Sequence, residues 1–390
     1  MARQKRKPKI KKILSATALL LAIPISVKLM LMSLPYMNAA ASKAALFSAG
    51  LAMPEGGKAA LDGNIPDTES TSGEISSSQT SSQPAVSSSP QSVLSSVVSA
   101  LSPFTELTSI PSQIVISDPA IAEKNRGKIL RQAYNGGASG DLISLSKGSV
   151  RNSTQISTDL VKKELAKGLD FSLKKSAEPQ VLIYHTHATE SYERATRDYY
   201  DKTYNSRSRD DSVNMNMVGD QIEYYIRAAG IGVIHDKTQH DYPSYTGAYD
   251  NSMKTIQKYL KQYPTIKVVL DVHRDAIQRS DGTRIAPIAK INGKNAAQIM
   301  IIAGAEREGD ITHDFYQNLR FAAHLQTQLE GDYPGLTRPI SFAYRKYNQS
   351  ASPGAVLLEF GGHGNSLEEA RYAGELAGKA IARALQKMQK

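Results

Sequence analysis

The sequence predicts an α/β fold with a mostly parallel sheet flanked by helices. Apolar runs of β-forming residues recur after Pro179, and segments of helical period separate them. Strands are expected at residues 181–184, 231–234, 266–272, 299–303 and 355–360. Helices are expected at residues 213–229, 253–260, 311–330 and 365–388. The last helix has Asn365 or Ser366 as a suitable N-cap, and Glu368 or Glu369 in its first turn favours the helix dipole.

The beginning of the chain has the pattern of a membrane signal. Residues 1–12 are rich in Lys and Arg, and residues 13–37 are almost entirely apolar. This pattern predicts a basic cytoplasmic tail followed by a transmembrane signal anchor. Lys28 interrupts the apolar run and the small residues at 38–41 also suit a cleaved secretory signal, so both interpretations stay open, with the anchor preferred. By the positive-inside rule we expect a single-pass protein of the cell membrane, with its N-terminus in the cytoplasm and the rest of the chain after the anchor outside.

The composition narrows the kinds of partner and cofactor. Much of the net charge of +10 lies in the basic tail, so we expect no nucleic-acid partner. The chain has no cysteine, so an exported protein of this sequence has no disulfide framework. Any zinc ion must therefore be held by histidine and carboxylate side chains.

The middle of the chain divides into a linker and a small lobe. Residues 38–126 are expected to form a flexible linker, because Ser, Thr, Pro and Gly dominate much of this stretch. Residues 127–178 predict a small accessory lobe with short strands at 128–130 and 141–143. A helix near 158–168, with Ser157 as its N-cap, completes the lobe, and residues 179–390 form the expected catalytic domain.

Two histidine-bearing segments follow apolar strands. His185, His187 and Glu190 come after the first strand of the domain, and His273 ends its most hydrophobic strand. Open sheets bind ligands beyond the carboxyl ends of their strands, so these side chains are expected to hold zinc there. The competing interpretation of His187 and Glu190 is a pair on a solvated helix, and that of His273 is a buried histidine bonded to a backbone carbonyl with the neighbouring charges in solvent.

Glu359 lies inside another apolar strand, where a carboxylate is costly unless it is paired or functional. In a zinc hydrolase such a carboxylate takes a proton from water and delivers it to the leaving nitrogen. The alternative is a salt bridge to Arg274 or Arg345. Arg274 itself suits either charge stabilisation of a developing oxyanion or a plain ion pair. His363 is a weaker candidate for a supporting or substrate contact.

The loop from Tyr192 to Tyr204 is rich in tyrosine. With Arg194, Arg197 and Arg207 it suits a groove that binds ring-shaped and acidic groups, although an ordinary solvated loop fits the composition equally.

The segments VLIYHTHATESY, DVHRDA and AVLLEFGGHGNSLEEA resemble those of the stage II sporulation protein P family, over roughly residues 127–390. The resemblance implies a zinc amidase-like fold and a membrane-anchored cell-wall hydrolase of endospore formers. It implies cleavage of the amide between N-acetylmuramic acid and the first L-Ala of the stem peptide, with an associated endopeptidase activity on cross-links. It also implies a role in septal wall degradation and engulfment, with stage II sporulation proteins D and M as partners.

The resemblance to the general amidase pattern also assigns roles. His187 and His273 correspond to zinc-binding histidines, and Glu359 to the catalytic glutamate. The second zinc ligand departs from the pattern, because Asp210 stands where those amidases have a glutamate. Either Asp210 or Glu190 takes that place, and Glu190 is preferred for its longer reach. His185 remains a competitor of His187.

Two other classes of protein compete with this interpretation. Amidohydrolase barrels and metallo-β-lactamase-like folds also carry His-x-His after a strand. The barrel needs about 250 residues of repeated βα units, and the β-lactamase-like pattern continues with Asp-His after the position of Ala188. The second class is a wall-binding scaffold that is inactive or depends on a partner. An inactive scaffold would be expected to lack Glu359 or a histidine, which this chain keeps.

Overall fold

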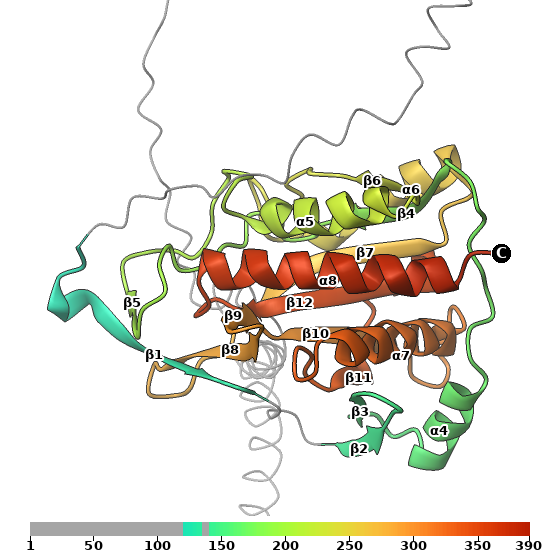
Figure 1. Ribbon diagram of the computed structural model, residues 1–390, viewed down its shortest axis with the longest axis horizontal. Helices are drawn as coiled ribbons and strands as arrows, with labels where there is room; N and C mark the ends of the chain where they lie inside the picture. Colours follow the sequence, from blue (N-terminus) through green and yellow to red (C-terminus); the bar gives the residue numbers. More distant parts are fainter. Residues whose placement is uncertain (1–119, 135–139) are drawn as a thin grey trace, which may run out of the picture. The chain divides into compact units, whose positions relative to one another are not determined.

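The computed structural model describes residues 120–134 and 140–390 (Figure 1). The expected tail at 1–12, the anchor at 13–37 and nearly all of the linker at 38–126 lie outside the described residues. Within the part of the chain that is described, no helix has the length and apolar character needed to cross a membrane.

A large sheet of eight strands forms the centre of the fold (Figure 1). Its order is β2-β3-β11-β10-β12-β7-β4-β6. The neighbours β12, β7 and β4 all run parallel, so their carboxyl ends meet at one edge of the sheet. The strands are β2 (Asp141–Ser144), β3 (Ser149–Asn152), β4 (Pro179–Tyr184), β6 (Gly232–His235), β7 (Val268–Asp275), β10 (Ile299–Ala305), β11 (Ile340–Tyr344) and β12 (Gly354–Gly362).

The sheet is mixed, so the expectation of a mostly parallel sheet is wrong. β10 runs antiparallel to β12, and β2 antiparallel to β3. The reason lies in the connections: β10 and β11 are joined through helix α7 (Phe315–Asp332) and are parallel, whereas only the short 3-10 helix η2 (Gln349–Ala351) lies between β11 and β12. A parallel return needs a crossover of about a dozen residues or more, so β12 runs in the opposite direction.

A second sheet has four strands in the order β5-β1-β8-β9. β1 is parallel to β8, and the other two pairs are antiparallel. The segment expected as an accessory lobe supplies β1 to this sheet and β2 and β3 to the large one. The strands are β1 (Arg126–Gln132), β5 (Tyr199–Asp201), β8 (Arg284–Ile291) and β9 (Lys294–Ala297), and the 3-10 helix η1 (Glu123–Asn125) precedes β1.

Helices cover both faces of the large sheet, as the α/β prediction requires. Val181 and Ile183 of β4 belong to a large hydrophobic core with α5, α7 and α8, whereas Leu182 and Tyr184 belong to a smaller core with α6. Successive residues of a strand point to opposite faces, which explains this division. Figure 1 shows α5, α7 and α8 over one face of the sheet. The helices are α4 (Thr158–Ala166), α5 (Met215–Ala228), α6 (Ala248–Gln262), α7 and α8 (Leu367–Lys387).

Two helix starts agree with the sequence pattern. The hydroxyl of Ser157 accepts a hydrogen bond from Leu160 N at the start of α4. Ser366 caps α8 and forms a capping box with Glu369, which settles the choice between Asn365 and Ser366. This cap holds the turn that joins β12 to α8.

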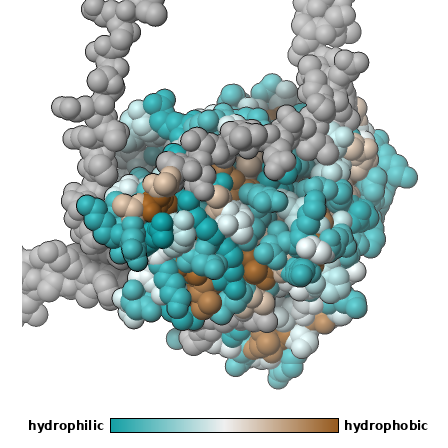
Figure 2. Space-filling view, turned by 60° about the vertical axis from the view of Figure 1, so that its left-hand side comes forward, coloured by the Kyte–Doolittle hydropathy of each residue, from teal (hydrophilic) through white to brown (hydrophobic). Residues whose placement is uncertain are grey.

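The surface in Figure 2 is mostly hydrophilic, and its hydrophobic residues form small separate patches. The large hydrophobic side chains that are exposed among the described residues are Leu142, Leu160, Tyr242 and Ile311. They lie on or near different elements, so they form no broad apolar face on the part of the surface that this view shows.

Candidate metal centre and active site

Three neighbouring strands carry the predicted site. His187 follows β4, His273 lies in β7 and Glu359 lies in β12. The parallel register of β7 and β12 pairs Glu359 directly with His273. Val272 and Leu358 point into the large core, so His273 and Glu359 point together to the opposite face, which α6 covers.

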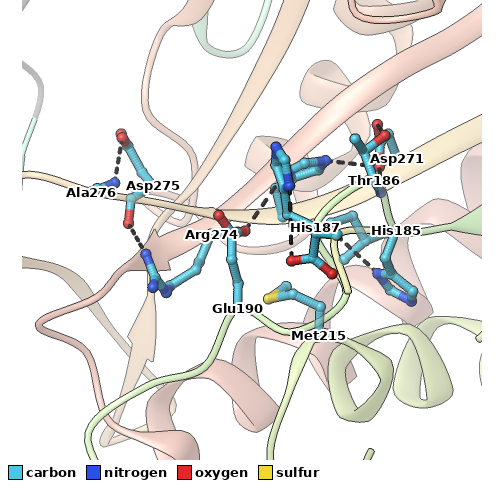
Figure 3. A network of polar contacts seen from close by, with 12 residues as sticks. His185, Thr186, His187, Glu190, Met215, Asp271, Arg274, Asp275 and Ala276 are labelled. Carbon is cyan, nitrogen blue, oxygen red and sulfur yellow. Dashed lines mark hydrogen bonds and ion pairs between the residues drawn. The ribbon is translucent and has the colours of Figure 1, made fainter. Parts of the chain in front are cut away.

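His187, Glu190 and His273 converge at the edge of the sheet. The rings of His187 and His273 have centroids 5.3 Å apart and are nearly perpendicular. Glu190 Oε2 lies 3.5 Å from His273 Nδ1. In Figure 3, His187 and Glu190 lie between Asp271 and Arg274. All three side chains are buried.

The donor set fits a zinc ion. Within the described part of the chain, His187 Nδ1 and Glu190 Oε1 are buried and have no hydrogen-bond partner. Such unsatisfied atoms cost about 1–3 kcal/mol each, and buried polar atoms are normally paired. Two imidazoles and one carboxylate are a common set for catalytic zinc, which would satisfy these atoms as an electron-pair acceptor.

The charges of the three side chains suit this role. Burial lowers the pKa of His187 to about 3, which keeps its imidazole neutral. Burial acts to raise the pKa of Glu190, but the hydrogen bond to His273 and the charge of Arg274 hold it well below its usual range. Burial also opposes the charge on His273, yet Asp271 and Glu190 raise its pKa well above 6.5. The raised pKa means that the His273 ring tends to carry a second proton, and a metal ion that binds Nδ1 would displace the proton from that nitrogen.

Glu359 has the properties of a proton carrier. Its side chain is 1% exposed, and Oε2 has no hydrogen-bond partner among the residues that the structure places. Burial raises the pKa of Glu359 well above its usual range, and the charges of Asp275 and Glu190 raise it further. A carboxyl group with a raised pKa can both accept and donate a proton near neutral pH.

Arg274 follows His273 on β7, so its side chain lies on the other face of the strand from that of His273, and it is fully buried. Its main-chain N–H donates to Glu190 Oε2 at 3.2 Å. Its Nε donates to the carbonyl of Ser191 at 2.6 Å, and Nη2 donates to the carbonyl of Ser206 at 2.8 Å. Arg274 thus holds the loop that carries Glu190, and the expected charge stabilisation by this residue stays a prediction.

The structure does not bring His185 into the group. Its Nδ1 lies 2.8 Å from the carbonyl of Val272, and its Nε2 lies 2.8 Å from His235 Nε2. The alternation along β4 directs His185 toward α5, where it lies close to Gly219. Both ring nitrogens therefore have other partners.

Asp210 also lies apart from the metal group. It is exposed, and its Oδ1 accepts hydrogen bonds from the N–H and the hydroxyl of Ser212. Of the two carboxylates considered for the second ligand, only Glu190 contacts a predicted histidine ligand in the described structure.

Tyrosines and a second acidic residue surround His187. Tyr245 stacks on its ring with a centroid distance of 4.2 Å, and Tyr249 contacts it edge-on at 5.6 Å. Asp241 Oδ2 lies 3.9 Å from His187 Nδ1 and 3.0 Å from Arg207 Nη1. Of these, only Arg207 was a sequence candidate. The others lie in a loop and helix without a motif of their own, and only their tyrosine content hints at the site.

The sequence pattern did not reveal a further cluster. Asp220, Glu223 and His235 have ligand atoms within 4.8 Å of one another, and they are the group of this kind in the described part of the chain. However, Lys237 lies 2.6 Å from Asp220 Oδ1, and Arg227 lies 2.7 Å from Glu223 Oε1. His235 Nδ1 lies 3.1 and 3.3 Å from the same two carboxylates. Cations already neutralise both carboxylates, so we interpret this cluster as an ion-pair network.

The amino-acid sequence matches one protein family and one curated relative. The family model described as Stage II sporulation protein P matches residues 119–384. Stage II sporulation protein P of Bacillus subtilis (strain 168) is 30% identical over 208 residues, which are 50% of this chain and 49% of that protein. The chain thus spans about half the length of the curated relative it matches.

Solved structures of amidases are also similar to this chain. The amidase AmiC2 of Nostoc punctiforme is 11% identical with a TM-score of 0.34, over 55% of this chain and 97% of that one. The CwlD amidase of Clostridioides difficile, in complex with the GerS lipoprotein, is 12% identical with a TM-score of 0.33, over 54% and 98%. The family assignment rests on the family model, which covers most of the chain and all of the candidate site. The protein therefore belongs to the stage II sporulation protein P family.

Proposed function

We propose that this protein is a membrane-anchored, zinc-dependent hydrolase of peptidoglycan that acts in septal wall degradation during engulfment. The observation that carries the proposal is the convergence of His187, Glu190 and His273 beside Glu359. Membership of the stage II sporulation protein P family supports the cell wall as substrate and sporulation as the setting.

His187, Glu190 and His273 would hold the zinc ion. When bound, zinc supplies Lewis-acid chemistry that makes water nucleophilic near neutral pH. Arg274 keeps Glu190 in place through its main-chain N–H and through the loop carbonyls that its guanidinium binds. Burial of the three side chains excludes competing solvent and strengthens every charge interaction in the site.

Glu359 carries the proton in this proposal. It takes a proton from the attacking water, whose oxygen bonds to the lactyl carbonyl carbon of N-acetylmuramic acid. The bond from that carbon to the nitrogen of the first L-Ala then breaks, and Glu359 delivers the proton to the departing amine. The same chemistry at a stem-peptide cross-link gives the proposed endopeptidase activity.

The location and partners are part of the proposal. Residues 1–37 support anchoring with the N-terminus in the cytoplasm, and the Ser-rich linker supports a tether to the outer side of the membrane. Stage II sporulation proteins D and M are the proposed partners. We further propose that activity of the isolated protein on intact sacculi is weak and rises when a partner is added, because an enzyme facing its own wall must be restrained.

Digestion of purified peptidoglycan by the full-length protein tests the reaction. The arms are added zinc, a chelator, Glu359→Gln and the matched control Glu223→Gln, whose carboxylate lies in the ion-pair network. We expect intact stem peptides with a free L-Ala amine, identified by mass spectrometry. These products should disappear with the chelator and with Glu359→Gln but persist with Glu223→Gln.

Other outcomes would redirect the proposal. Shortened stem peptides that vanish under the same treatments would make the enzyme an endopeptidase. Products that persist with the chelator would exclude zinc chemistry. Wall binding without any product, even with the proposed partners present, would favour the scaffold.

A further inference from the structure

Asp271 is a buried carboxylate that the proposed reaction does not use. It precedes His273 by two residues on β7, so both side chains point to the same face. Asp271 is 2% exposed, and its Oδ1 lies 2.8 Å from His273 Nε2. A buried carboxylate needs partners, and one of its partners is a proposed zinc ligand.

The same carboxylate binds the segment that carries the other histidine ligand. Thr186 N donates to Asp271 Oδ1 at 2.9 Å, and the Thr186 hydroxyl donates to Oδ2 at 2.7 Å. Thr186 is the residue immediately before His187. Figure 3 shows Asp271 and Thr186 close together on one side of the network. Asp271 therefore joins both strand ends that supply imidazoles.

Residues of other elements hydrogen-bond to the Thr186 turn and hold it in place. The Thr186 hydroxyl lies 2.9 Å from that of Ser252 on α6. Asn348 Nδ2 donates to Ser252 Oγ and to the carbonyl of Tyr249, each at 3.0 Å. Asn348 and the preceding Tyr347 both have positive φ, a costly conformation that surrounding contacts must maintain. Asp271 thus contacts His273 on β7 and Thr186 in the turn after β4, and Ser252 of α6 in turn contacts Thr186.

The position of Asp271 decides which nitrogen of His273 is available. Its Oδ1 lies 2.8 Å from Nε2, so a proton on that nitrogen would be stabilised by the adjacent negative charge. Nδ1 then remains for a metal ion, and it is Nδ1 that lies 3.5 Å from Glu190 Oε2. We propose that Asp271 is a positioning residue that selects Nδ1 of His273 as the metal-binding atom and aligns the His187 turn beside it. This inference rests on the proposed zinc function.

Zinc affinity of the full-length protein tests the inference. Zinc would be titrated in competition with a chromogenic chelator, for the wild type, Asp271→Asn and the control Asp220→Asn. The asparagine side chain of Asp271→Asn keeps the shape but can offer N–H toward Nε2, so we expect zinc affinity to fall by about 10–100-fold. The control also removes a carboxylate from a buried imidazole, that of His235, and its zinc affinity should equal that of the wild type.

The outcomes separate the inference from the proposed function. Wild-type affinity in Asp271→Asn would overturn the inference and leave the zinc function standing. Failure of the wild type to bind zinc would overturn both.

A second measurement does not depend on whether Asp271→Asn folds. Nitrogen NMR of the zinc-loaded wild type, with ¹⁵N-labelled histidine, should show the metal on Nδ1 of His273 and the proton on Nε2. The signal is assigned by its loss in His273→Gln. Metal on Nε2 would overturn the inference even if Asp271→Asn does not fold.

Discussion

Two groups of histidine and carboxylate side chains lie at opposite faces of the large sheet, one buried and one partly exposed, and they differ in how their charges are balanced. In one group, His187, Glu190 and His273 leave buried atoms without hydrogen-bond partners in the described structure, and the nearest cation to Glu190 Oε1 is Arg207 at 3.6 Å. In the other, Asp220 and Glu223 contact His235, and each also contacts Lys237 or Arg227. The second group is tighter, but Lys237 and Arg227 already neutralise its two carboxylates at 2.6 and 2.7 Å.

This difference shows that closeness of ligand atoms is a weak criterion for a metal centre. A group whose charges are already paired gains little from an ion, because the ion must displace existing salt bridges. A group with unsatisfied buried donors gains stability when an ion binds. The predictions below test this distinction by changing one group and leaving the other intact.

The largest effect is expected on hydrolysis. Glu359→Gln should lower the rate of product release by about 10²–10⁴-fold, because the amide cannot carry the proton. Zinc content should stay that of the wild type, since Glu359 is not among the proposed ligands. Glu223→Gln is the counterpart in the other group and should retain its rate. Rates measured on purified peptidoglycan, with zinc analysis of each sample, check this.

The next effect concerns metal binding. His187→Gln should weaken zinc affinity by about 100-fold or more, since a direct ligand contributes at least as much as a supporting residue. In the wild type, zinc at about 100 times its Kd should stabilise the fold by about 2.7 kcal/mol. Thermal unfolding with and without zinc should show that gain in His235→Gln and not in His187→Gln. The reverse pattern would place the metal in the other group.

A smaller effect is expected on the pH dependence of stability. Burial acts to lower the pKa of His235, but hydrogen bonds to Asp220 and Glu223 raise it above 6.5. A raised folded-state pKa gives stability that is complete below pH 6.5 and is lost as the pH rises through the folded value. His235→Gln should therefore cost about 1.5–3 kcal/mol at pH 6 and less at pH 9. Urea unfolding at both pH values measures the difference, and an equal cost at both would contradict it.

The smallest effect is expected on the free energy of unfolding when a side chain is added at Gly219, beside the ion-pair network. A Cβ at Gly219 would overlap His235 Nε2 and lie 2.8 Å from His185 Nε2. Gly219→Ala should destabilise the fold by about 1–3 kcal/mol and leave zinc affinity unchanged. Chemical unfolding combined with zinc titration checks both parts. A loss of zinc affinity would mean that His185 and its partners take part in the metal centre.

Much of the fold could be predicted because long apolar runs mark buried strands. Strands β4, β7 and β12 lie where the sequence pattern puts them, and so does helix α5. β5 is only three residues long, and Pro287 interrupts the pattern of β8, so the pattern did not reveal them. The antiparallel direction of β10 relative to β12 depends on the segments that connect the strands. The hydrophobic pattern of the strands does not show how those segments run.

The site was predictable only in part, for a related reason. His273 and Glu359 lie near the carboxyl ends of hydrophobic strands, where open sheets bind ligands. The partner of His185 is His235, fifty positions away on a different strand. The pairing of Asp271 with Thr186 likewise needs two strands to be brought together. Such long-range contacts leave no local pattern in the sequence.

The pairing of Glu359 with His273 in register also limits how this protein can change. A strand side chain changes face with every residue, so deleting one residue of β12 before Glu359 would turn its carboxyl group into the hydrophobic core. The loops beyond the strands can vary in length without that penalty. Changes in what the candidate site binds are therefore expected to arise by insertion in the loops, while the spacing within β7 and β12 stays constant.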